Sequence, residues 1–142
     1  NWKEVGGSDA PITVVNKAEG RSTLELFLSY FHLKNTDVQA SVVIGDNEQG
    51  IKTVAGNPDA IGYVSVGSAE YAASHGVAIR PLAMQGVPAS IASVRNGSFP
   101  LARELTLVTK RPPTGLAKEL IDFARSPAAH DLVSQLYFVP LD

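Results

Sequence analysis

Apolar residues along the chain alternate between short β-branched runs and longer stretches with helical spacing. Residues 12–15, Ile-Thr-Val-Val, are typical of a buried strand. Leu24, Phe27, Leu28 and Phe31 then recur at i, i+3, i+4 and i+7, which is the spacing of an amphipathic helix. This pattern predicts that a strand is followed directly by a helix near the start of the chain.

Short polar motifs mark where the predicted helices begin and end. Ser22 and Glu25 fit a Ser-x-x-Glu capping box, so the first helix is predicted to start at Ser22. Asp46 and Gln49 form a second cap pattern, and Gly56 stands where the helix that they begin should end. Each predicted helix therefore has its own local start signal.

The same alternation continues to the end of the chain. The further predicted elements are strands at residues 41–44, 60–66 and 105–109, an extended segment at 77–84, helices at 68–75 and 88–95, two closing helices at 116–124 and 126–136, and an extended piece at 138–141. Strands separated by helices imply an α/β fold with a mostly parallel sheet flanked by helices. Because no internal repeat or low-complexity linker interrupts the pattern, residues 1–142 are predicted to form a single α/β domain.

Composition narrows the class of protein. A hydrophobic content of 44% and a charged content of 18% are those of a globular chain, and a net charge of −2 does not favour nucleic acid or anionic membranes. The absence of cysteine excludes disulfides, thiolate metal sites and cysteine nucleophiles. Because the sequence starts with Asn1 rather than Met, we expect that an upstream part was removed or not included.

The turn between the first strand and the first helix, residues 16–23, carries the candidate chemistry. Its sequence is Asn-Lys-Ala-Glu-Gly-Arg-Ser-Thr. The start of a helix offers unpaired backbone N–H groups and a positive dipole end, so an oxyanion fits there. Ser22 and Thr23 can add hydroxyl donors, and Lys17 and Arg21 add positive charge. The turn therefore predicts an anion site.

Glu19 is an acid within this otherwise basic turn, and two explanations stay open. An ionised carboxylate would repel a fully ionised oxyanion, but it could accept a proton from HPO4 2− or H2PO4 −, which sulfate lacks at neutral pH. Glu19 would then select protonated oxyanions. Alternatively, Glu19 is a solvated first-turn acid or an ion-pair partner of Lys17 or Arg21.

Catalytic and metal-binding functions find little support in the sequence. His32, His75 and His130 are far apart and lack an acid at ligand spacing, so no metal site is expected. No Gly-x-Ser-x-Gly elbow and no nucleophile–base pair is evident. We therefore expect a protein that is not an enzyme and needs no cofactor.

The turn resembles a stretch in the phosphate-binding proteins of ABC transporters, the PstS-like periplasmic solute-binding proteins. That family enters a helix through a stretch similar to Arg-x-Asp/Glu-Gly-Ser-Gly-Thr with an aromatic residue behind it, and residues 17–23 with Phe27 match it. The segments "GSDAPITVVN", "IKTVAGNPDAIGYVSVG", "NGSFPLARELTLVTK" and "AKELIDFARSPAAHDLV" resemble further parts of the family in the same order. The resemblance covers nearly the whole chain.

The resemblance implies a periplasmic-binding-protein-like (type II) lobe. The chain would correspond to the second lobe plus the C-terminal return segment of a two-lobed protein, with a possible crossing near residues 97–104. The implied ligand is inorganic phosphate, and the implied site residues are Lys17, Glu19, Gly20, Arg21, Ser22 and Thr23. The implied partners are an ABC permease of the inner membrane and a missing N-terminal lobe or a second copy of the chain. The implied location is periplasmic or extracellular, with the protein lipid-anchored or soluble.

The chain departs from the family pattern at two places. Lys17 stands where the family usually has Arg, which keeps the charge but loses the bidentate fork. Arg21 and Ser22 stand where the family usually has Ser-Gly. Two alternatives therefore stay open, namely a receptor for another oxyanion and an interaction or scaffold module without ligand. Because half of a two-sided site would be missing, phosphate affinity of the chain alone is predicted to be weak or undetectable.

Overall fold

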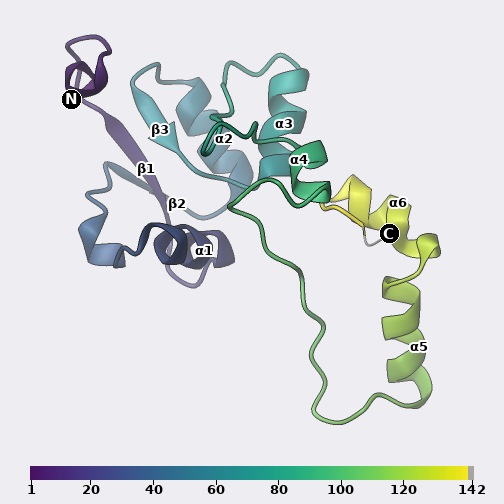
Figure 1. Cartoon of the computed structure of the whole chain (residues 1–142). Coiled ribbons are helices and arrows are strands. Elements are labelled where there is room, and N and C mark those ends of the chain that lie inside the picture. The colour runs from purple at the N-terminus through teal and green to yellow at the C-terminus, as the bar shows by residue number, and fades with distance from the viewer. Residues whose placement is uncertain (141–142) are drawn as a thin grey trace.

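The computed structural model describes residues 1–140, which form a parallel sheet with helices on both sides (Figure 1). The strands are β1 (Thr13–Lys17), β2 (Val42–Ile44) and β3 (Ala60–Gly62). The α-helices are α1 (Ser22–Phe31), α2 (Asn47–Ala55), α3 (Val66–Ser74), α4 (Ile91–Arg95), α5 (Gly115–Ala124) and α6 (His130–Gln135). The described residues also form the short 3-10 helices η1 (Trp2–Val5), η2 (Asn35–Asp37) and η3 (Pro127–Ala129).

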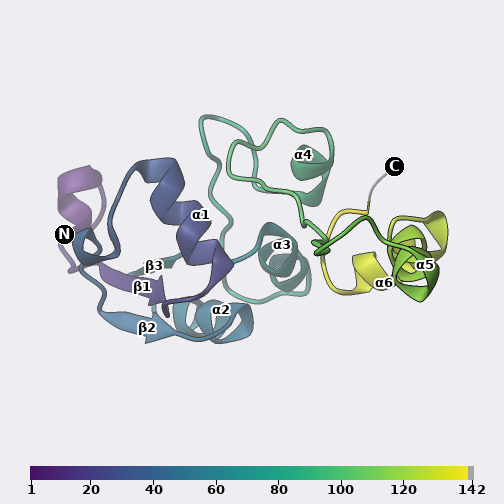
Figure 2. The same ribbon diagram turned by 90° about the horizontal axis from the view of Figure 1, so that it is seen from below.

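Strand β1 lies in the centre of the sheet and pairs in parallel with β2 on one side and β3 on the other. Lys17 lies opposite Ile44, and Val15 lies opposite Gly62. Helices α1 and α2 lie on opposite faces of this sheet, and both contact β1 (Figure 2). The predicted α/β class, with a parallel sheet flanked by helices, is confirmed.

The core lies where these helices pack on the sheet. Val15 and Ile44 are the most deeply buried large side chains, with 2% and 1% of their surface exposed. Leu24 of α1 and Ile51 of α2 are buried against them from the two helices. A Cβ atom on Gly50 would lie 2.6 Å from Cδ1 of Ile44, so a larger residue there would require the buried Ile44 side chain to shift.

Several predicted elements have different bounds in the structure. The predicted strand at 60–66 ends at Gly62, and the helix predicted at 68–75 begins earlier, at Val66. The helix predicted at 88–95 is shorter and begins at Ile91, because the Ser90 side chain caps it by accepting from Ser93 N–H. The sequence therefore predicts that these elements exist but not where they end. Their ends depend on helix capping and on strand pairing.

Two predicted extended segments form no strand. Residues 77–84 contain only one isolated bridge, between Met84 and Val87. Residues 105–109 have no regular structure, so the prediction of a strand there is wrong. At the C-terminus, residues 138–140 are irregular, and Leu141 of the predicted final piece lies outside the described residues.

The irregular segment between α4 and α5 leaves the sheet and its helices and runs to α5 at the far end of the molecule (Figure 1). Phe99 at its start is buried, but the leucine and valine side chains from residue 103 onward are exposed, with exposed fractions of 64% for Leu105 and 86% for Val108. Helix α5 exposes apolar residues as well, with 82% for Leu116. We call residues 103–124 the arm.

Helix α6 returns the chain to α3. A Cβ atom on Gly67 of α3 would lie 2.2 Å from the backbone oxygen of Tyr137, so the two backbones approach more closely than a side chain would allow. The rings of Tyr71 and Tyr137 lie 4.8 Å apart. The C-terminal residues therefore pack against α3, whereas the arm does not.

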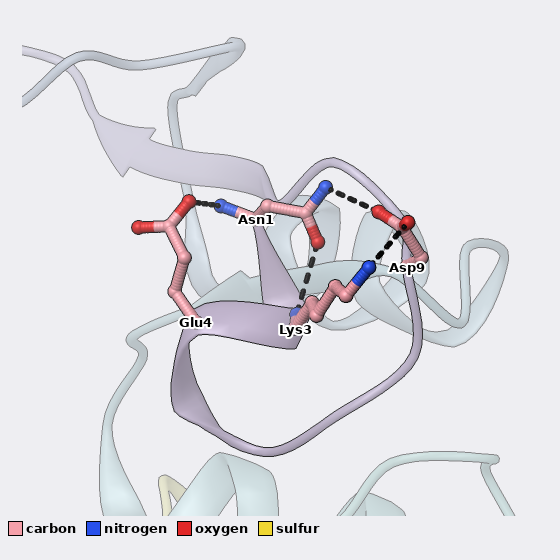
Figure 3. A network of polar contacts seen from close by, with 4 residues as sticks. All are labelled: Asn1, Lys3, Glu4 and Asp9. Atoms are coloured by element: carbon pink, nitrogen blue, oxygen red, sulfur yellow. Dashed lines mark hydrogen bonds and ion pairs between the residues drawn. The ribbon is translucent and has the colours of Figure 1, made fainter.

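The N-terminal residues close into a small polar turn. Figure 3 shows the contacts that join Asn1, Lys3, Glu4 and Asp9. The indole N–H of Trp2 donates to the backbone oxygen of Asp59, at 3.0 Å, and Asp59 precedes β3. This turn therefore lies at the amino end of the sheet, opposite to the strand ends that matter for the site.

Candidate functional site

The carboxyl ends of the three parallel strands lie at one edge of the sheet, where α/β proteins commonly bind ligands. The turn 16–23 starts with the last two residues of β1, and residues 45–47 follow β2. Tyr63 comes directly after β3. The edge therefore brings together segments that are separate in the sequence.

A pocket of about 190 Å³ opens at this edge. Its lining residues are Lys17, Arg21, Ser22, Thr23, Gly45, Asp46 and Asn47. The first four belong to the predicted anion turn, and the last three come from the start of α2. The sequence offers a signal for this second group, because residues 45–47 directly follow a predicted strand, although the motif at Asp46 by itself predicts only a helix cap.

The start of α1 presents free backbone donors. Arg21, not Ser22, occupies the N-cap position, and its side chain makes no cap hydrogen bond. The helix begins at Ser22 as predicted, but the predicted Ser22–Glu25 capping box is wrong, because Ser22 is already helical. Within residues 1–140, no group accepts a hydrogen bond from the backbone N–H of Ser22 or Thr23. These donors are thus available to an anion.

Gly20 shapes the entry into α1. Its φ of 76° lies in the left-handed region, which favours glycine. A Cβ atom at this position would meet no atom within 4 Å, so the backbone conformation is the constraint and space is not. Gly20 does not line the pocket. Its contribution is the turn that brings Arg21 to the helix start.

Lys17 is a buried cation, with 4% of its surface exposed. Its ammonium donates to Oδ1 of Asn47. Burial lowers the pKa of Lys17 below its ordinary value, the charge of Arg21 lowers it further, and the carboxylate of Asp46 opposes both effects. Two neighbouring cations in one pocket give a positive potential that suits an anion.

Arg21 and Asp46 approach the pocket from different elements. Nη2 of Arg21 lies 3.8 Å from where a Cβ atom on Gly45 would be, so the guanidinium extends from α1 toward the loop after β2. Oδ1 of Asp46 accepts from the backbone N–H of Gln49 at 2.8 Å, which confirms the predicted cap of α2. The pocket therefore contains one carboxylate, which is committed in part to the helix start.

Glu19 lies outside the pocket lining, although it belongs to the same turn. Its side chain is exposed, and Oε1 accepts from the side-chain amide of Asn35 at 3.2 Å. Oδ1 of Asn35 accepts in turn from the amide of Asn16 at 3.2 Å. The carboxylate is therefore connected to η2, and no ion pair joins it to a cation of residues 1–140.

Tyr63 does not line the pocket but contacts the carboxyl end of β1 and helix α1 beside it. Its ring stacks on Phe27 with centroids 4.0 Å apart, which connects β3 to α1 across the sheet. Its hydroxyl donates to Oδ1 of Asn16 and accepts from the backbone N–H of Lys17 at 3.4 Å. Burial raises the pKa of Tyr63, and the bond from Lys17 opposes this, so the hydroxyl keeps its proton at neutral pH.

Residues 1–140 contain no cluster of three or more His, Cys, Asp or Glu side chains arranged to bind a metal ion. Over the same residues, no helix has both the length and the apolar character that a membrane span requires.

The parallel sheet and the pocket at its carboxyl edge define an α/β protein with a candidate ligand site. Residues 1–128 match the PBP superfamily domain, and the chain belongs to this superfamily. The phosphate-binding protein PstS of Bacillus subtilis (strain 168) is 32% identical over 126 residues, which are 89% of this chain and 40% of that protein. The resemblance to phosphate-binding proteins of ABC transporters is thereby confirmed.

Solved structures give the same result for the fold. One similar structure is a crystal structure described as a phosphate ABC transporter substrate-binding protein from Clostridium perfringens, with bound phosphate. Its TM-score is 0.79 and its sequence identity is 28%, and the match covers 100% of this chain and 57% of that chain. A phosphate-binding protein of a phosphate ABC transporter from Streptococcus pneumoniae TIGR4 has a TM-score of 0.69 and 25% identity, covering 92% of this chain and 51% of that chain. The chain spans about half the length of the relatives it matches.

Proposed function

We propose that the chain binds inorganic phosphate and forms part of the solute receptor of an ABC phosphate uptake system. The observation that carries this proposal is the pocket at the carboxyl edge of the sheet, where Lys17 and Arg21 meet the free donors of the α1 start. The names of the relatives, which are phosphate-binding proteins, support phosphate as the anion. The protein then acts by binding and release and catalyses no reaction.

Different pocket residues contribute charge and hydrogen-bond donors to the oxyanion. Lys17 supplies charge from a buried position, where water weakens it less than at the surface. Arg21 is exposed and can close over the ligand with two parallel donors. Ser22 and Thr23 supply backbone N–H groups and hydroxyls at the positive end of the α1 dipole.

Glu19 is proposed to accept the proton of a protonated phosphate, and Gly20 to hold the turn that this requires. The carboxylate of Glu19 is exposed and has one described partner, Asn35, so most of its acceptor capacity is free for a ligand. Because Glu19 lies outside the pocket lining, this role requires its side chain to turn toward the bound anion. If Glu19 has the role, E19Q reduces the preference for phosphate over sulfate.

The partners and the location follow from the relatives and remain part of the proposal. The chain spans about half the length of those relatives, so we propose that a second lobe, or a second copy of the chain, completes the site. We further propose an ABC permease of the inner membrane as the partner and a periplasmic or extracellular location. Residues 97–104 are the proposed crossing between the lobes, and the arm and C-terminal helices are the proposed return segment.

An NMR titration of the 142-residue chain tests the phosphate site. Because the site is open on one side, we expect binding only at millimolar phosphate, with shift changes at the backbone amides of Ser22 and Thr23. K17M removes the buried charge and should abolish these changes. K118M removes an exposed lysine on α5 and should leave them intact. Unchanged amides at the α1 start would contradict the proposal and favour a module that binds no ligand.

A further inference from the structure

The buried ammonium of Lys17 has one side-chain partner within residues 1–140, and that partner is uncharged. Nζ of Lys17 donates to Oδ1 of Asn47, and no carboxylate of these residues lies within ion-pair distance of it. A buried ammonium that has no partner is costly, and a lysine side chain has several rotatable bonds that allow it to move away. Asn47 therefore decides where this charge is held.

Asn47 is itself fixed by the start of α3. Its Oδ1 also accepts from the backbone N–H of Ser65 at 3.3 Å, and its Nδ2 donates to the hydroxyl of Ser65 at 3.0 Å. The Ser65 hydroxyl lies 2.8 Å from that of Ser68. These contacts determine which end of the amide faces Lys17, because Oδ1 meets N–H donors and Nδ2 meets a hydroxyl.

We propose that Asn47 is a positioning residue of the anion site, which holds the ammonium of Lys17 at the pocket without adding a negative charge of its own. This inference rests on the proposed function, because it concerns the same pocket. An ammonium has three N–H donors, and Asn47 accepts one of them. The other two remain for a ligand, and the side chain is already ordered before the ligand binds.

The neutrality of Asn47 is the central point of this proposal. A carboxylate at this position could hold the ammonium equally well, but the resulting ion pair would remove much of the positive potential that attracts an anion. An apolar residue would preserve the positive potential but would not hold the ammonium of Lys17 in place. An amide meets both requirements, since it accepts a hydrogen bond without adding charge. Lys17, Asn47 and Ser65 thereby connect the three elements β1, α2 and α3 at the pocket.

Two variants of Asn47 separate position from charge, with inorganic phosphate as the probe. N47A should weaken phosphate binding about tenfold, because a hydrogen bond to a charged group is lost. N47D should weaken it at least as much, although the lysine remains held. The second readout is the side-chain ammonium signal of Lys17 in ¹⁵N NMR without ligand. This signal should broaden or vanish in N47A and persist in N47D.

A matched control and two outcomes make the test decisive. S68A removes the outer hydroxyl of the network but keeps the contacts of Asn47 with Lys17 and Ser65, so phosphate affinity should stay within about twofold. If wild type binds phosphate, and N47A neither weakens binding nor alters the Lys17 signal, the positioning proposal is overturned. If wild type binds no phosphate while N47A alone releases the Lys17 signal, the proposed function fails and the positioning of Lys17 by Asn47 is supported.

Discussion

The sheet with its helices and the arm have similar sequence patterns but differ in structure. Residues 12–15 and 105–109 are both apolar runs with strand character, yet only the first contributes to a strand. Val15 has 2% of its surface exposed, whereas Val108 has 86% exposed. The difference shows that an apolar pattern states which side chains can be buried, while a strand also needs a neighbour to pair with.

The physical reason lies in the backbone hydrogen bonds. Strand β1 pairs with β2 and β3, so its backbone groups exchange hydrogen bonds on both sides. Residues 105–109 have no strand beside them within the described part of the chain, and water satisfies their backbone groups instead. A strand from the second lobe proposed above would give this segment such a partner.

The largest expected difference between the two regions is in amide hydrogen exchange. Amides in β1 should exchange about a thousandfold more slowly than those of residues 105–109, because exchange from a paired strand requires opening of the structure. Hydrogen-exchange mass spectrometry on the 142-residue chain measures both regions in one experiment. Equal protection in the two regions would show that residues 105–109 find a partner in solution, for example in a second copy of the chain.

A matched pair of leucine substitutions should show the next largest difference. L24A removes a side chain that is 4% exposed and should lower the free energy of unfolding by about 3 kcal/mol. L105A removes one that is 64% exposed and should change it by less than about 0.5 kcal/mol. Urea denaturation followed by circular dichroism gives both values. A loss for L105A as large as that for L24A would mean that the arm is packed in solution.

Local signals made part of the fold predictable. The cap at Asp46 and the end of α2 at Gly56 depend on neighbouring residues, and both predictions are confirmed. The end of β3 and the lack of a strand at residues 105–109 depend on strands elsewhere, which a pattern along the chain does not contain. The elements predicted best are those whose hydrogen bonds close within a few residues.

The same distinction holds for the candidate site. The turn after β1 could be predicted, because a basic stretch with hydroxyls at a helix start has a known chemical use, and four of its residues line the pocket. The contacts of Asn47 could not be predicted, because its partners Lys17 and Ser65 are 30 and 18 residues away in the sequence. Its importance depends on the parallel pairing that brings the ends of β1 and β2 together.

The smallest expected effect concerns the pH dependence of anion affinity. Lys17 in the sheet region is buried, whereas Lys118 in the arm is exposed. Because burial lowers the pKa of Lys17, this residue should lose its proton as the pH rises through a value below 10.5. Sulfate affinity should then fall several-fold over that range, and sulfate is a suitable probe because it does not titrate there. K17R keeps its charge and should retain the affinity to higher pH, whereas K118R should follow wild type. A pH profile of K17R identical to that of wild type would show that another group controls the loss.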